Sequence, residues 1–192
     1  MKRRHFLKTT VAGSAFLATS GLWNLNKAFA AHPENISYCF QSEREIPIAY
    51  EVDVVVIGGS VAGVAAAVAA AQQGAKVFLV AQETYLGEDI CGNFRYWNGD
   101  QSTELGRKLF ANGQATPMYV KRTLDQELIS QKIGFMFSTF VTDLVIDSSH
   151  QPSGVVIVNR SGRQAIVGKT IVDATPRAMV ARMSAAHFTE YP

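Results

Sequence analysis

Cysteine and histidine are scarce in this chain of 192 residues. The two cysteines lie far apart, which excludes a C-x-x-C redox pair, a cysteine-rich zinc site and a four-cysteine iron–sulfur site. The histidines have no metal-ligand spacing and form no catalytic constellation, so we expect no metal ion. A disulfide between the two cysteines stays open for an oxidising compartment. These residues are Cys39, Cys91, His5, His32, His150 and His187.

Acidic residues are absent from the first 30 positions, which carry five of the 18 lysines and arginines. The formal net charge of +2 therefore comes from the N-terminus, since the remaining chain has 13 basic and 16 acidic residues. Binding to nucleic acid normally requires a basic surface. The charge balance beyond residue 30 argues against such a surface, and we predict no nucleic-acid partner.

Long hydrophobic runs are also missing. Residues 9–23 are weakly apolar, but they are too few and too rich in Gly, Ser and Thr for a membrane span. With the basic start and the small residues Ala28 and Ala30, they predict a signal peptide at 1–30. The segment RRHFLK resembles a twin-arginine export motif, which implies an exported, periplasmic protein. An uncleaved signal that anchors the chain to a membrane is the alternative.

A strand, a tight turn, a helix and a second strand are present between residues 51 and 82. The apolar, β-branched run Val52–Ile57 leads into a glycine-rich turn. A strand that ends at a helix N-terminus directs N–H groups and the helix dipole at one point, where a phosphate can bind. The pattern therefore predicts a dinucleotide site that contains Ile57, Gly58, Gly59, Ser60, Val61, Ala62 and Gly63.

Two positions depart from the usual dinucleotide fingerprint. Ser60 replaces the middle glycine of G-x-G-x-x-G, and Ala81 follows the second strand where an acidic residue normally binds the ribose hydroxyls. Gln82 and Glu83 are the substitutes that we expect beside the ribose. The residues that follow include no nearby lysine or arginine, so a group that would bind the 2′-phosphate of NADP is missing.

The chain as a whole predicts an α/β domain at 51–192, preceded by a polar lead-in segment at 31–50. We expect a Rossmann-like fold, whose parallel central sheet carries a β-hairpin or small β-meander insertion. Residues 84–100 lack periodicity, and such a long irregular segment is more often functional than filler. We expect helices at 61–73, 101–110, 118–131 and from 178, and strands at 52–57, 76–80, 134–138, 140–147, 155–159, 164–167 and 171–173.

Five segments in order carry a family resemblance over nearly all of residues 52–181. They are VVVIGGSVAGVAAAVAAAQQGAKVFLV, YLGEDICG, VKRTLDQEL, FVTDLVID and IVDATPRA. Together they resemble the FAD-dependent oxidoreductases of the glutathione-reductase-like flavoprotein superfamily. The nearer resemblance is to the family related to HdrA-type heterodisulfide reductase.

The resemblance implies FAD as the cofactor and a role for each segment. The glycine turn would hold the pyrophosphate, and residues 81–83 would lie beside the adenosine ribose. Pro176 departs from the Ala-Thr-Gly that relatives often have at this point. The remaining implied contacts are Leu86, Gly87 and Glu88 toward the flavin, Val141 at the adenine, and Ala174 with Thr175 as a later contact.

The activity expected from this resemblance is flavin-mediated electron or hydride transfer with a small-molecule substrate or an electron carrier. Cys91 is a weak catalytic candidate, because a dithiol mechanism needs a second cysteine nearby and none is present. Relatives continue further, so we expect a C-terminally truncated FAD-binding portion. An NAD-binding Rossmann module and a non-catalytic fragment or interaction module are the alternatives.

Overall fold

The computed structural model describes residues 43–97, 99 and 101–189. The chain divides into one unit of residues 1–44 and another of residues 45–192, and all the elements described below belong to the second. The predicted signal peptide, its cleavage site and Cys39 lie outside the described residues. Within the part of the chain that the structure describes, no helix is long and apolar enough to span a membrane.

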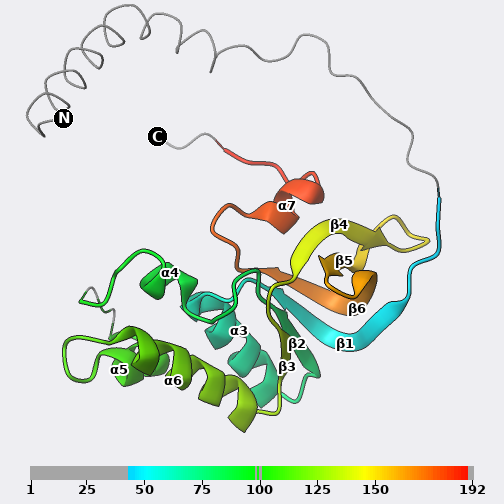
Figure 1. Ribbon diagram of the computed structural model, residues 1–192. Helices are drawn as coiled ribbons and strands as arrows, with labels where there is room; N and C mark the ends of the chain where they lie inside the picture. Colours follow the sequence, from blue (N-terminus) through cyan, green and yellow to red (C-terminus); the bar gives the residue numbers. More distant parts are fainter. Residues whose placement is uncertain (1–42, 98, 100, 190–192) are drawn as a thin grey trace, which may run out of the picture. The chain divides into compact units, whose positions relative to one another are not determined.

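The second unit is built on one six-stranded sheet with the strand order β3-β2-β1-β6-β5-β4 (Figure 1). The first four strands in this order run parallel, whereas β5 and β4 continue the sheet as an antiparallel meander. This confirms the predicted α/β, Rossmann-like fold with a meander insertion. The strands are β1 (Ile48–Ile57), β2 (Val77–Val80), β3 (Gly134–Met136), β4 (Phe140–Ile146), β5 (Pro152–Asn159) and β6 (Gly162–Asp173).

Several strand ends differ from the sequence prediction, and two of the differences change the pairing at the centre of the sheet. The return strand of the hairpin and the separate short strand at 171–173 are one continuous strand, β6, because it pairs with β5 on one side and with β1 on the other. Gly168 lies within this strand, where an added Cβ would come within 2.6 Å of Val55 Cγ2. The other difference is at β1, which begins at Ile48 inside the predicted lead-in segment and pairs there with β6.

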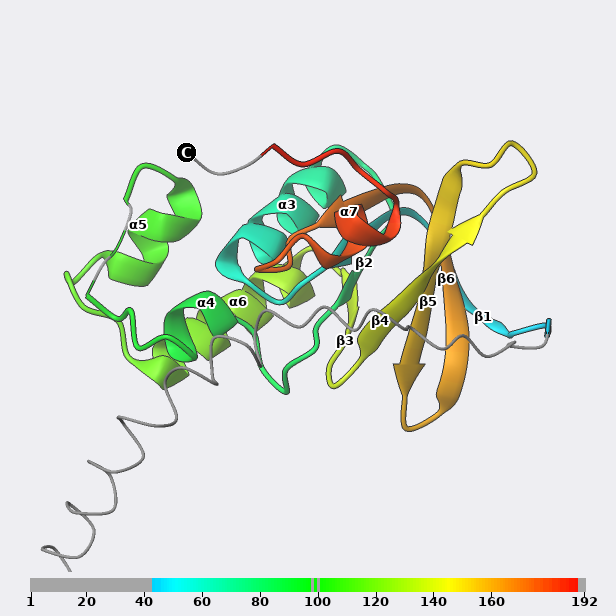
Figure 2. The same ribbon diagram turned by 90° about the horizontal axis from the view of Figure 1, so that it is seen from above.

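Successive residues of the central strands point to opposite faces of the sheet and form two separate cores. Val56 and Leu79 pack with helices α3 and α6, whereas Val55 and Phe78 belong to the core on the other face. Figure 2 shows α3 to α6 grouped at one side of the molecule and the antiparallel strands at the other. The helices are α3 (Val61–Gln72), α4 (Glu88–Cys91), α5 (Glu104–Phe110), α6 (Pro117–Ser130) and α7 (Met179–Met183).

Local sequence accounts for the helix starts. Thr103 and Thr116 cap α5 and α6, and each side-chain oxygen accepts a hydrogen bond from a backbone N–H in the first turn. Pro117 then occupies the first turn of α6, where its fixed φ angle suits a helix. Among the described residues of the segment 84–100, which was predicted to be irregular, helix α4 is the one regular element.

Candidate functional site

The turn between β1 and α3 requires glycine at two positions. Gly58 has φ +115°, and a Cβ there would lie 2.5 Å from the carbonyl oxygen of Ala174, directly after β6. A Cβ at Gly63 would collide with the carbonyl oxygen of Gly58. The turn therefore lies tightly between the end of β6 and the start of α3. Strand β1 has β2 on one side and β6 on the other, so the turn after β1 is at a switch point of the sheet topology. Open α/β sheets bind ligands at such points.

Ser60, the departure from the glycine fingerprint, has a structural role. Its Oγ accepts a hydrogen bond from the N–H of Gly63 at 3.1 Å, so it is the N-cap of α3. The same hydroxyl donates to the carbonyl oxygen of Ala174 at 3.2 Å. Ser60 is 6% exposed, and it ties the helix start to the loop after β6.

Asp89 is a second side chain at the start of α3, and the sequence prediction missed it. Its Oδ1 accepts a hydrogen bond from the N–H of Val61 at 3.1 Å. Asp89 belongs to α4, on the segment that follows β2. Nothing local marks it as special, because its contact with α3 depends on how the segment folds back toward the glycine turn.

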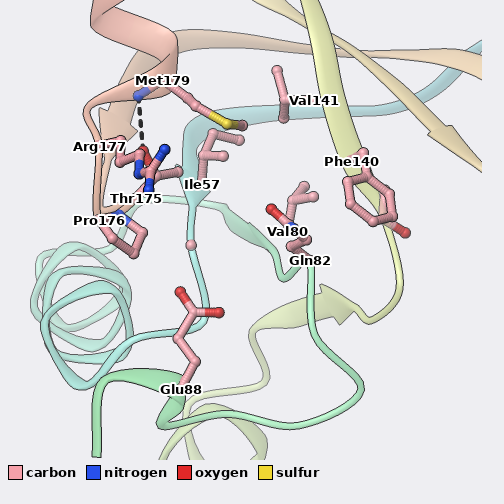
Figure 3. Close-up of a pocket in the computed structure, with 12 residues that line it drawn as sticks. Ile57, Val80, Gln82, Glu88, Phe140, Val141, Thr175, Pro176, Arg177 and Met179 are labelled. Carbon is pink, nitrogen blue, oxygen red and sulfur yellow. Dashed lines mark hydrogen bonds between the residues drawn. The ribbon is translucent and has the colours of Figure 1, made fainter. Parts of the chain in front are cut away.

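A cavity of about 280 Å³ opens beside the turn, at the carboxyl ends of β1 and β2 (Figure 3). Six predicted site residues line it: Ile57, Gly58, Gln82, Glu88, Val141 and Thr175. The side chain of Glu88 points toward the cavity from below the turn, opposite the loop that carries Thr175. The lining residues that the sequence prediction missed are Val80, Thr139, Phe140, Pro176, Arg177 and Met179.

A second cavity, of about 630 Å³, also borders the glycine turn and shares three lining residues with the first. The shared residues are Gln82, Glu88 and Pro176, and the turn contributes Gly58 to the first cavity and Ser60 to the second. The predicted residues Ser60, Glu83 and Ala174 line only the second. Its other lining residues, which the prediction missed, are Tyr85, Asp89, Gly92, Asn93 and Arg95.

The other predicted cofactor residues line neither cavity, and all of them except Val61 and Ala62 are buried. Ala81 is fully buried, and its backbone N–H donates to Met136 while its carbonyl accepts from Thr139. Gly87 donates its N–H to the carbonyl of Gly59 at 2.7 Å. These seven residues are Gly59, Val61, Ala62, Gly63, Ala81, Leu86 and Gly87.

The acidic groups around the second cavity affect one another. Burial raises the pKa of Glu88 above its ordinary value, and the negative charges of Glu83 and Asp89 raise it further. Glu88 borders both cavities.

Asp173 organises the loop that borders both cavities, and the sequence prediction did not include it. Its carboxylate accepts hydrogen bonds from the N–H and the hydroxyl of Thr175 and from the N–H groups of Val180 and Ala181. Burial alone would raise the pKa of Asp173, but these hydrogen bonds together lower it below the ordinary value. The Thr175 hydroxyl also accepts a hydrogen bond from the N–H of Met179, drawn as a dashed line in Figure 3.

Cys91, the weak catalytic candidate, lies in the core beneath the site. Its thiol is free and buried, donates weakly to the carbonyl oxygen of Pro117 at 3.9 Å, and lines neither cavity. Burial raises the pKa of this thiol, which disfavours the reactive thiolate. No cluster of metal-ligating side chains occurs among the described residues.

Three solved structures resemble this fold at low sequence identity. THI4 of Thermovibrio ammonificans is 18% identical with a TM-score of 0.56, over 71% of this chain and 64% of that one. The anhydrotetracycline hydroxylase OxyS of Streptomyces rimosus is 14% identical with a TM-score of 0.51, over 74% and 35%. The p-nitrophenol 4-monooxygenase PnpA of Pseudomonas putida DLL-E4 is 13% identical with a TM-score of 0.50, over 74% and 46%.

These likenesses concern the fold alone, and this chain spans less than two thirds of the length of each of the three proteins. No match was found among the curated proteins. Residues 53–190 match the family described as FAD dependent oxidoreductase, over most of the chain and across both cavities. The chain therefore belongs to the FAD dependent oxidoreductase family, whose cofactor is FAD.

Proposed function

We propose that this chain is the FAD-binding portion of an exported oxidoreductase and holds FAD across the two cavities beside Gly58. The observation that carries the proposal is that both cavities border one glycine turn and share Gln82, Glu88 and Pro176. The close-packed backbone requires glycine at Gly58 and Gly63, and a tight glycine turn that leads into a helix N-terminus is where dinucleotide folds bind the pyrophosphate.

The first cavity suits the adenosine half of FAD. Ile57, Val80 and Val141 give it apolar walls, and Val141 lies on β4, which is the edge strand of the sheet. Gln82 would bind the ribose in place of the missing carboxylate, since Ala81 is buried and faces the glycine turn. The second cavity, with Ser60, Glu88 and Ala174 in its wall, would continue toward the flavin.

FAD supplies the electron or hydride transfer when it is bound, and the protein binds and orients it. The reaction partner would be a small-molecule substrate or an electron carrier. A dithiol relay is not part of the proposal, because Cys91 is buried away from both cavities. The five segments that carry the family resemblance support a nearer kinship with the glutathione-reductase-like flavoproteins and with HdrA-type heterodisulfide reductase.

An NAD-binding module is the competing interpretation of the glycine turn. The antiparallel meander of β4, β5 and β6 after the β1-α3-β2 unit favours FAD, because a simple NAD module continues with further parallel strands. The exported location rests on residues 1–30, whose twin-arginine-like start and small residues before Ala31 support a cleaved signal.

Cofactor binding is tested with the full chain, incubated with FAD and separated from free flavin by gel filtration. We expect visible flavin absorbance to elute with the protein, and Gly58→Val to abolish it because of the clash with Ala174. Gly113→Val is the matched control, since Gly113 also has a positive φ, +78°, but has open space around its Cβ position.

Retention of flavin by Gly58→Val would contradict the assigned site. Retention of NAD with no flavin would favour the NAD module, and retention of neither would favour the non-catalytic interaction module.

A further inference from the structure

An acidic side chain of this protein holds the position at which a dinucleotide fold normally receives phosphate. The N–H of Val61, in the first turn of α3, donates to Asp89 Oδ1 at 3.1 Å. The positive end of a helix dipole and its unpaired N–H groups attract anions at this point. Asp89 also lines the second cavity, so it lies along the proposed path of the cofactor.

The position of Asp89 is fixed by the packing of α4. Gly87 has φ +78° at the helix start, and its N–H donates to the carbonyl of Gly59 at 2.7 Å. A Cβ at Gly87 would come within 2.8 Å of Val120 Cγ1 on α6, so the two helices are in close contact. Cys91, at the other end of α4, is buried in the core. The carboxylate is thus presented to α3 by a well-packed element.

Capping α3 does not by itself require Asp89. Ser60 already serves as the N-cap and accepts the hydrogen bond from Gly63. Asp89 therefore adds a negative charge to a helix start that is already capped, at the site where the pyrophosphate of the cofactor would bring two more.

We propose that Asp89 is an internal competitor for the pyrophosphate site: its carboxylate accepts the hydrogen bond at the start of α3, and FAD displaces it on binding. This inference rests on the proposed function. The N–H of Val61 cannot serve both anions at full strength, and the carboxylate and the phosphates repel each other. Asp89 thus stabilises the fold at the start of α3 and weakens the affinity of the protein for phosphate-bearing ligands.

The proposal predicts two opposite effects of Asp89→Asn. The variant should unfold at a lower temperature, because it loses a charge-assisted hydrogen bond at the helix start. It should also bind ADP about tenfold more tightly, a difference of about 1.4 kcal/mol. Adenosine, which has no phosphate, should bind both proteins equally. A residue with only a structural role would give the first effect without the second.

The test measures ADP, adenosine and FAD binding by calorimetry and thermal unfolding without ligand, using the full chain and its variants. Asp143→Asn is the matched control, because Asp143 lies on β4 two residues from Val141, lines neither cavity, and its replacement also takes away one negative charge. We expect a change below twofold in ADP affinity for Asp143→Asn. An equal gain in ADP affinity in both variants would overturn the proposal, since the loss of any nearby negative charge would then explain it. The proposal would also be wrong if Asp89→Asn bound ADP no more tightly than the original chain, or did not bind it at all.

FAD separates this proposal from the proposed function. If Asp89→Asn bound ADP more tightly but neither protein bound FAD, the competitor role of Asp89 would stand and the FAD-binding function would be wrong. If the original chain bound FAD and Asp89→Asn showed no gain in affinity, the FAD-binding function would stand and the competitor role would be wrong.

Discussion

A single hydroxyl group connects the glycine turn to the loop after β6. Ser60 bonds to Gly63 within its own helix and to Ala174 across the site, so one small side chain joins two walls of the proposed cofactor groove. A glycine at this position would let a phosphate approach more closely but would provide neither bond. The serine therefore leaves less space near the cofactor, but its two hydrogen bonds fix the position of the turn against the loop after β6.

We expect Ser60→Ala to lower the free energy of unfolding by about 2 kcal/mol, from about 1 for the lost N-cap and about 1 for the lost bond to Ala174. Thr116→Ala is the control, because Thr116 caps α6 with one bond only and should cost about 1 kcal/mol. Urea unfolding of the three proteins measures the difference. Equal losses in the two variants would mean that the bond to Ala174 contributes nothing.

The loop after β6 and the short helix α7 form one element that is held by a single carboxylate. Ala178, which precedes α7, has φ +49° and offers no side-chain cap. Asp173 takes over this role from a distance by accepting the N–H groups of Val180 and Ala181, while Thr175 accepts that of Met179. Because Pro176 in this loop lines both cavities, the shape of the groove depends on Asp173.

We expect Asp173→Asn to lower the free energy of unfolding by about 1–3 kcal/mol at neutral pH, since charge-assisted hydrogen bonds are lost. The pKa of Asp173 is lower in the folded than in the unfolded protein, so its contribution is complete above the ordinary aspartate pKa, about 4. It is lost as the pH falls through the lowered pKa. The difference between the two proteins should therefore shrink in acid, which urea unfolding at several pH values measures.

Asp147→Asn is the control for this experiment. Asp147 also accepts backbone hydrogen bonds, from Ser149 and Gln151, but it does so in the turn between β4 and β5. It should leave FAD binding unchanged, whereas Asp173→Asn should weaken it. If the stability difference for Asp173→Asn were independent of pH, the carboxylate charge would not be responsible.

At the scale of the whole molecule, one sheet combines a parallel half that carries the glycine turn with an antiparallel half that closes the first cavity. Strand β6 belongs to both halves, because it pairs in parallel with β1 and antiparallel with β5. The first cavity thus needs β1 and β2 from the parallel half and β4 from the antiparallel half, so it forms only when the entire sheet is assembled. A protein of this kind suits an export route that carries folded chains, as proposed for residues 1–30.

Replacing Arg3 and Arg4 together by lysine should abolish export, because the twin-arginine route requires this pair, and the protein should then remain in the cytoplasm at full length. Cell fractionation with immunoblotting measures the location, and N-terminal sequencing of the exported protein should begin near Ala31. Lys8→Arg, which keeps the charge outside the pair, is the control. Normal export of the double variant would contradict the proposed signal.

The local features of the site could be predicted from the sequence. The β-branched run before Gly58, the small residues of α3 and the apolar run Val77–Val80 indicate a strand–turn–helix–strand unit, because strand periodicity, glycine and helix propensity act over a few residues. The same reasoning correctly indicated an α/β fold and the position of the turn. It divided β6 into two strands, since its continuity depends on pairing with strands far away in the sequence.

The tertiary structure alone decided what surrounds the turn. Ser60 meets Ala174 across 114 positions, and Val61 meets Asp89 across 28. Such contacts follow from how the elements pack, and no local pattern predicts the hydrogen bonds that Asp89 and Asp173 accept. The amino-acid sequence by itself determined that a dinucleotide turn exists, because backbone conformation is a local property. Which side chains compete for the turn or support it was decided by packing between distant segments.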